Sequence, residues 1–211
     1  MLERRLGVRH ATTLGLLAGA VVLLACVPLR ADADADDRLA KVTAAFIYNF
    51  TRYTDWPDAA FPKDDDPLVI AVVDTDKVFF TLAALTDGQS VDGRPIRVHW
   101  VQPPEPSDDE DETSRRAKWD DFLARLRRSH VVFVGDAYRH VTGRVVLGLR
   151  ERNVLTVGDG PGFAGAGGML GLKLLKGRMV FQANVDAIKA AGLIVSSKVL
   201  RLAEIVSSRH D

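Results

Sequence analysis

The stretch Val154-Leu-Thr-Val-Gly158-Asp-Gly-Pro-Gly-Phe163-Ala-Gly-Ala-Gly-Gly168 indicates the fold class of this chain. Val154–Val157 is a short, mostly β-branched run bounded by glycine, which predicts a buried strand. Five glycines between Gly160 and Gly168 follow it, and they give the backbone access to positive φ angles. The sequence therefore predicts a strand that leads directly into a glycine-rich loop.

The residues after this loop predict a hairpin. Two apolar segments, Met169–Leu175 and Met179–Val185, flank Lys176-Gly177, which has the composition of a two-residue β-turn. After Asp186, apolar residues recur at helical spacing as far as Val206 and predict a helical C-terminal segment. The order expected here is strand, glycine loop, hairpin, helix.

Upstream, Leu68–Val73 is a continuous apolar run with the length of a strand that is covered on both faces. Ile96–Val101 predicts a second strand with partial alternation, and Val131–Val134 predicts a third strand. Amphipathic helical segments lie between them. Because helices alternate with apolar strands, we predict an α/β fold. It is a single three-layer domain with a mostly parallel sheet flanked by helices and a C-terminal antiparallel hairpin that supplies edge strands.

A helix is predicted after Asp36-Asp37, which are good N-cap residues. Trp56-Pro57 ends it, because a residue before proline avoids the helical region. The helix has many aromatic residues, with two interpretations: all of them pack in the core, or the outward-facing Tyr48 and Trp56 contact a partner. The expected core-facing stripe is Leu39, Val42, Phe46, Phe50 and Tyr53.

Residues 1–33 have the pattern of a signal peptide. A basic start is followed by the uncharged apolar run Leu14–Leu24, and Ala31-Asp-Ala33 supplies small residues for cleavage. The run is short for a membrane span. Leu23-Leu-Ala-Cys26 also resembles a bacterial lipobox, so lipidation at Cys26 is the alternative. Both interpretations export the protein and leave 34–211 as the α/β domain.

The composition of this mature domain excludes some functions. It holds 24 basic and 26 acidic residues, so it has no basic excess of the kind that binds nucleic acid. Cys26 is the only cysteine in the chain, so no intramolecular disulfide can form in the domain. A domain of this size can be stable through its hydrophobic core alone.

The segment Gln102–Glu112 is rich in proline and then strongly acidic, which predicts a solvated surface loop. Its cluster Asp108–Glu112 contains carboxylates that calcium could bind. The cluster lacks the spaced ligands and the central glycine of an EF-hand loop. We therefore favour a plain surface loop over a calcium site.

The glycine loop contains Gly160-Pro-Gly162-Phe-Ala-Gly165, which matches the G-x-G-x-x-G pattern of dinucleotide-binding folds. That fingerprint needs a following helix to receive the pyrophosphate, whereas a hairpin is predicted here. Pro161 also removes an amide that could face a phosphate. The sequence therefore disfavours a dinucleotide and leaves a backbone nest for a small anion as the alternative.

No other pattern predicts catalysis or a cofactor. The histidines lack metal-ligand spacing, there is no nucleophile motif, and Ser196-Ser197 are interpreted as helix caps. The remaining enzyme hypothesis is a carboxylate pair of Asp159 and Asp186, although turn formation explains both residues. We expect no enzyme activity, no cofactor and no metal.

Several separate motifs resemble the YfiR-like proteins, in the same order and over nearly the whole mature chain. In the first half they are Ala44-Ala-Phe-Ile-Tyr-Asn-Phe50, Thr54-Asp-Trp-Pro57 and Gly93-Arg-Pro-Ile96. In the second half they are Val154-Leu-Thr-Val-Gly-Asp159, Gly162-Phe-Ala164, Gly167-Gly-Met169, Val180-Phe-x-x-Asn184 and Ala191-Gly-Leu-x-x-Ser-Ser197.

This resemblance implies a periplasmic repressor that binds the periplasmic domain of a membrane-anchored diguanylate cyclase, modulating cyclic-di-GMP and hence biofilm formation. It also implies a homodimer and relief by an outer-membrane lipoprotein. A sensor kinase as partner is the alternative within this class. A small-ligand binding protein serving a transporter is the alternative outside it. The contact residues expected for the partner are Phe163 on the glycine loop, Tyr48 and Trp56.

Overall fold

The computed structural model describes residues 28–105, 107 and 111–208, with side chains from residue 34 onward. The chain divides into two units, Met1–Asp36 and Asp37–Asp211. Only the helical stretch from Pro28 to Asp36 is described in the first unit. The fold and the sites below belong to the second unit. The predicted signal peptide and Cys26 lie mainly outside the described residues.

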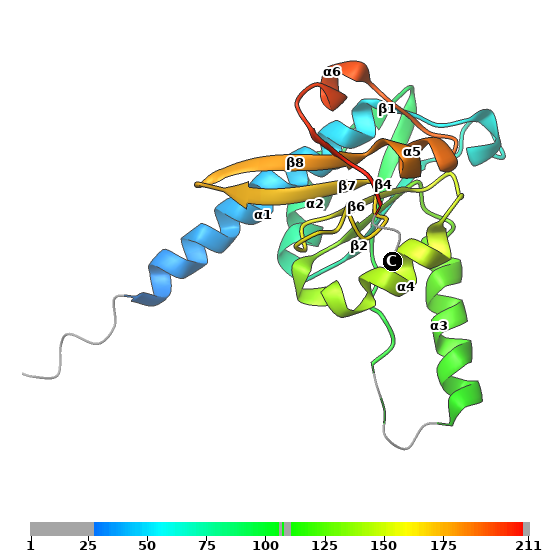
Figure 1. Ribbon diagram of the computed structural model, residues 1–211, viewed down its shortest axis with the longest axis horizontal. Coiled ribbons are helices and arrows are strands. Elements are labelled where there is room, and N and C mark those ends of the chain that lie inside the picture. The colour runs from blue at the N-terminus through cyan, green and yellow to red at the C-terminus, as the bar shows by residue number, and fades with distance from the viewer. Residues whose placement is uncertain (1–27, 106, 108–110, 209–211) are drawn as a thin grey trace, which may run out of the picture. The chain divides into compact units, whose positions relative to one another are not determined.

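Among the described residues, the main sheet contains eight strands in the order β10-β8-β7-β6-β5-β2-β4-β3. Its strands are β2 (Leu68–Val73), β3 (Ser90–Val91), β4 (Arg94–Trp100), β5 (Val131–Val134), β6 (Leu155–Gly158), β7 (Leu170–Leu175), β8 (Arg178–Asn184) and β10 (Glu204–Val206). Figure 1 labels β2, β4, β6, β7 and β8 of this sheet and the helices around it. The strands β1 (Thr54–Asp55) and β9 (Ile194–Val195) form a separate antiparallel pair. The helices are α1 (Pro28–Arg52), α2 (Asp76–Thr86), α3 (Glu112–Leu126), α4 (Thr142–Leu149), α5 (Val185–Ala190) and α6 (Ser197–Leu200), with 3₁₀ turns η1 (Asp58–Ala60) and η2 (Asp136–Val141).

The centre of the sheet is parallel. β2 pairs in parallel with β4 on one side and with β5 on the other, and β6 and β7 continue the parallel run. β2, β5 and β6 are almost entirely buried, as continuous apolar runs require. The predicted α/β class, with a mostly parallel sheet flanked by helices, is confirmed.

Each face of the sheet has its own hydrophobic core. On one face, α1, α2 and α5 pack over strand residues such as Ile70, Phe133 and Leu170. On the other face, α3 and α4 pack over residues such as Val73 and Val134. This division follows from the alternation of side chains along each strand, which sends neighbouring residues to opposite faces.

The predicted core-facing stripe of α1 is wrong, because the helix is turned about its axis and buries another side. Leu39, Val42 and Tyr53 are 40–42% exposed, and of the predicted set only Phe50 is fully buried. The buried face instead carries small residues with one large one per turn, and it consists of Ala40, Thr43, Ala44, Ile47, Phe50 and Thr51. Small side chains let the helix axis approach the sheet closely, so the larger apolar residues flank the contact. The helix also begins at Pro28, upstream of the predicted cap at Asp36-Asp37.

The C-terminal hairpin is confirmed. β7 and β8 pair antiparallel, and Lys176 and Gly177 both have positive φ angles, 49° and 75°, as a primed two-residue turn requires. The hairpin does not form the sheet edge, because β10 adds in parallel beside β8.

The helical C-terminal segment is only partly confirmed. It breaks into α5, β9, α6 and β10. One break lies at Gly192, which has a φ of 69°, and a residue with positive φ cannot continue a right-handed helix.

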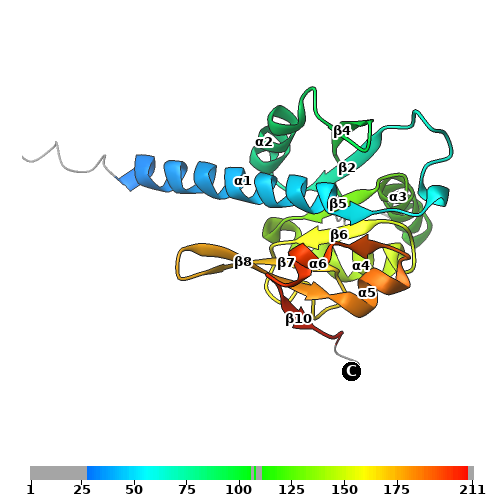
Figure 2. The same ribbon diagram turned by 90° about the horizontal axis from the view of Figure 1, so that it is seen from above.

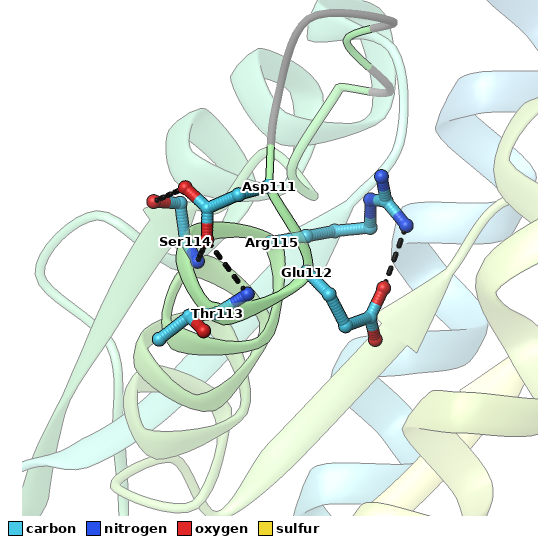
Figure 3. Close-up of polar contacts among 5 residues, drawn as sticks. All are labelled: Asp111, Glu112, Thr113, Ser114 and Arg115. Atoms are coloured by element: carbon cyan, nitrogen blue, oxygen red, sulfur yellow. Dashed lines mark hydrogen bonds and ion pairs between the residues drawn. The ribbon is translucent and has the colours of Figure 1, made fainter.

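The end of the acidic segment forms a helix cap. The Asp111 carboxylate accepts hydrogen bonds from the backbone N–H groups of Thr113 and Ser114, at 2.9 and 3.0 Å (Figure 3). Glu112 pairs with Arg115 at 2.7 Å. The hydrogen bonds from Ser114 and Thr113 lower the pKa of Asp111, because they favour its charged form. The predicted loop thus ends by starting α3. Residues 106 and 108–110 lie outside the described part.

Candidate functional site

Three neighbouring parallel strands are each followed by an aspartate, and the three aspartates lie at the same end of these strands. Asp74 follows β2 directly, Asp136 follows β5 after Gly135, and Asp159 follows β6. From β2 the chain passes to β4 on one side and then to β5 on the other side. The carboxyl ends of β2 and β5 therefore flank a topological switch point, where ligands bind in open α/β sheets. We call Asp74, Asp136 and Asp159 the acidic edge.

The acidic edge is tightly packed. Asp74 is only 7% exposed, and a Cβ atom at Gly135 would collide with its carboxylate, so glycine is required there. The Asp159 carboxylate accepts a hydrogen bond of 2.6 Å from the backbone N–H of Asp136. Among the residues that the structure describes, the buried Oδ1 atom of Asp136 has no hydrogen-bond partner. This arrangement brings negative charges together with few donors to offset them.

Burial and mutual repulsion raise the pKa values of two of these groups. The pKa of Asp159 is raised from 3.8 to about 6, first by burial and then by the charges of Asp74 and Asp136, against the opposing hydrogen bond from Asp136. The pKa of Asp74 is also raised, mainly by burial and further by the charge of Asp136. Both effects disfavour the ionised carboxylate. The Asp159 carboxyl group therefore binds a proton at a higher pH than an ordinary aspartate does.

The chemistry available at this edge is limited. Within the described ranges, no group of three or more His, Cys, Asp or Glu side chains is placed to hold a metal ion. Asp186, the other half of the predicted carboxylate pair, is exposed in the first turn of α5. Asp159 instead packs with Asp74 and Asp136. The enzyme hypothesis thus loses its second carboxylate.

The sequence contains a signal for the acidic edge that our prediction missed. Val-Val-Asp74, Val-Gly-Asp136 and Val-Gly-Asp159 each end an apolar strand with an aspartate. Because the carboxyl ends of parallel strands lie at the same edge, these three aspartates were bound to meet once the strands were adjacent. The sequence patterns gave Asp159 a role in a turn or in a pair with Asp186, and no contact with Asp74 or Asp136.

Phe163 does not present its ring to solvent, which corrects the expectation of a surface contact. It is 3% exposed and packs in the core beneath α3 and α4. A Cβ atom at Gly158 or at Gly168 would collide with the ring, so these two glycines make room for it. The loop is further fixed by a hydrogen bond of 3.0 Å from the Asn184 side chain to the Ala164 carbonyl. Gly158 and Gly168 thus leave space for the Phe163 ring, which anchors the loop in the core.

Tyr48 and Trp56 are both half-buried against the core. The Tyr48 hydroxyl donates to the Gln89 side chain at 3.3 Å, and the Arg52 guanidinium lies 5.6 Å from the Tyr48 ring centre. The Trp56 indole N–H donates to the His130 carbonyl at 3.3 Å. Both residues therefore have structural contacts and an exposed remainder, and the structure does not bring them together with Phe163.

His130, which had no predicted role, anchors the chain that follows α1. It is 8% exposed, stacks on Phe61 at 4.2 Å and lies edge-on to Trp56. Its Nδ1 atom accepts from the Val69 N–H at 3.0 Å, so Nε2 carries the proton and donates to the Ala60 carbonyl at 3.0 Å. Burial lowers the pKa of His130. The residue is a neutral structural histidine.

The outer flank of α1, together with the residue that directly follows the helix, carries an exposed apolar stripe. We call it the α1 stripe and define it as Leu39, Val42, Phe46 and Tyr53. Leu39, Val42 and Tyr53 are 40%, 41% and 42% exposed, and Phe46 is half-buried against Phe181 of β8. The four residues recur at helical spacing and therefore lie on one side of the helix. A contiguous apolar strip rimmed by polar residues is typical of a protein contact.

A family model described as YfiR/HmsC-like matches residues 40–204, which is most of the chain. The chain belongs to the YfiR/HmsC-like family. The match covers α1 from Ala40 onward, the whole sheet to Glu204 and the acidic edge. A search of curated proteins found no match.

This match to the family model confirms the resemblance found in the sequence. YfiR/HmsC-like proteins are in general periplasmic regulators of diguanylate cyclase signalling. In the described part of the chain, no helix combines the length and the apolar character needed to cross a membrane. For a regulator of this kind, the relevant chemistry is contact with another macromolecule. The α1 stripe is one of the exposed apolar surfaces in the described part of the chain.

Proposed function

We propose that this YfiR/HmsC-like protein binds the periplasmic domain of a membrane-anchored signalling protein and represses it. The partner is a diguanylate cyclase, with a sensor kinase as the second choice, and the output is the level of cyclic-di-GMP. Family membership supports the signalling role, and the exposed α1 stripe is the observation that supports a contact surface. We propose no catalytic activity for the protein.

The α1 stripe suits a reversible contact. Its side chains are held by a helix that is itself fixed on the sheet through Ile47 and Phe50, so little conformational entropy is lost on binding. Tyr48 and the Trp56 ring lie at or just beyond the same helix, and we retain them as contact residues at its margins. Phe163 leaves this set because it is buried.

A double variant, Leu39→Glu with Val42→Glu, tests this surface. Both positions are about 40% exposed, so the folded state should tolerate the change. Two buried charges at an apolar interface should weaken partner binding by at least ~30-fold, equivalent to about 2 kcal/mol. We expect cells that express the variant to have cyclic-di-GMP levels as high as cells without the protein.

The matched control is Leu147→Glu on α4, a leucine that is 70% exposed on the opposite side of the sheet. This variant should repress as well as the wild type. Equal repression by the α1 double variant and the control would remove α1 from the contact. If deletion of the gene leaves cyclic-di-GMP unchanged in every growth condition, the cyclase is not the partner, and kinase output or solute uptake is the next quantity to measure.

A further inference from the structure

The outer half of the β7–β8 hairpin pairs with no other strand among the described residues. β7 pairs with β6 only at Leu170 and Gly171, and β8 pairs with β10 only from Gln182 onward. Between these points the two strands pair only with each other. Figure 2 shows the hairpin projecting beyond the ends of the other sheet strands. The ribbon therefore presents its tip, residues 173–180, away from the body of the sheet.

The tip has an unusual composition for an exposed turn. It carries Lys173, Lys176 and Arg178, and residues 170–185 contain no Asp or Glu. In the described ranges, the structure records no ion pair for these three cations. Beside them, Leu174 is 61% exposed and Leu175 is 48% exposed. Turns that only face water are usually built from small polar residues.

The two exposed leucines lie on opposite faces of the ribbon. Leu174 lies opposite Met179, whereas Leu175 lies opposite Arg178 and Lys173 lies opposite Val180. Successive residues of a strand point to opposite faces, so Lys173, Leu175 and Arg178 share one face, and Leu174 lies on the other. A tip with an exposed leucine on each face cannot be covered by one flat protein surface. It can be covered on all sides by insertion into a lipid headgroup layer.

We propose that the tip of the β7–β8 hairpin docks the protein onto an anionic phospholipid bilayer. Leu174 and Leu175 enter the headgroup region, and Lys173, Lys176 and Arg178 lie against lipid phosphates. Charge complementarity carries this assignment, because the chain as a whole is neutral and the positive charge of the hairpin is local. Peripheral proteins bind bilayers through the same combination of apolar insertion and basic attraction.

This inference does not depend on the identity of the signalling partner. The hairpin tip and the α1 stripe share no residue, so each surface can be changed alone. Docking at the bilayer confines the protein to the layer in which a membrane-anchored partner is found. Confinement raises the effective concentration of one for the other without any added contact between them.

Vesicle co-sedimentation of the protein purified from the cells that express it tests the proposal. The two probes are vesicles of phosphatidylcholine alone and vesicles of phosphatidylcholine mixed with phosphatidylglycerol. We expect binding to the mixed vesicles only, weakened by added salt. Replacing the three cations together, Lys173→Gln, Lys176→Gln and Arg178→Gln, should weaken binding roughly 100-fold. Replacing Leu174 and Leu175 by serine should weaken it at least about 10-fold.

The charge-matched control replaces three exposed cations of α5, α6 and the residue after α6: Lys189→Gln, Lys198→Gln and Arg201→Gln. It should bind mixed vesicles like the wild type, as should the α1 double variant. The proposal is overturned if phosphatidylglycerol does not increase binding, or if the hairpin and control triple variants bind equally. It is also overturned if the hairpin variants lose repression in cells but keep full vesicle binding, because the tip would then be a protein contact.

Discussion

Replacing Phe163 by alanine is expected to lower the free energy of unfolding by about 3–5 kcal/mol, the usual cost of removing a buried phenylalanine ring from a core. The ring is 3% exposed and fits between Gly158 and Gly168, which cannot move inward to fill the cavity because they belong to or adjoin fixed strands. Thermal and denaturant unfolding of the purified variant measure this loss.

Phe163→Leu is the matched variant, because leucine keeps most of the apolar volume and should lose clearly less stability than alanine. The same experiment separates two roles for the loop. If Phe163 contacted a partner directly, alanine would leave the free energy of unfolding nearly unchanged and weaken partner binding alone. That outcome would contradict the packing seen around Gly158 and Gly168.

Replacing Asp159 by asparagine is expected to stabilise the protein at neutral pH. The folded-state pKa of Asp159 is about 6, above its ordinary value of 3.8. Between these values the folded state binds more protons than the unfolded state, so the free energy of unfolding falls as pH rises from about 4 to about 6. The upper limit of this loss is about 3 kcal/mol, at about 1.4 kcal/mol for each unit of pKa. Asparagine does not ionise, and its Oδ1 atom can still accept from the Asp136 N–H.

The variant should therefore be more stable than the wild type by about 1–3 kcal/mol at pH 7 and nearly equal to it at pH 4. Unfolding measured across this pH range gives the difference directly. Asp186→Asn is the control, because it removes an exposed carboxylate that lies outside the acidic edge. A wild type whose stability rises between pH 4 and pH 6 relative to Asp159→Asn would show that Asp159 is stabilised as an anion, against the packing of the acidic edge.

The corrected predictions for the α1 stripe and for Phe163 have one physical cause. We assumed that the large apolar residues of α1 face the core and that the aromatic ring of a glycine loop faces solvent. In the structure, small residues at Ala40 and Ala44 let α1 approach the sheet, and missing side chains at Gly158 and Gly168 open a space for Phe163. Packing depends on the volume left by all neighbours, which a local pattern of hydrophobicity does not contain.

The sequence by itself determined the central strands of the sheet, the hairpin turn and the family. Continuous β-branched runs predict buried strands, and a Lys-Gly pair between apolar segments predicts the turn, because these are local properties of the backbone and its side chains. Only the tertiary structure decided which residues meet. It placed Asp74, Asp136 and Asp159 side by side, buried Phe163, and left the α1 stripe and the hairpin tip exposed. Strand order and helix rotation are set by the packing of the whole domain, so residues far apart in sequence acquire their pKa values and exposure only there.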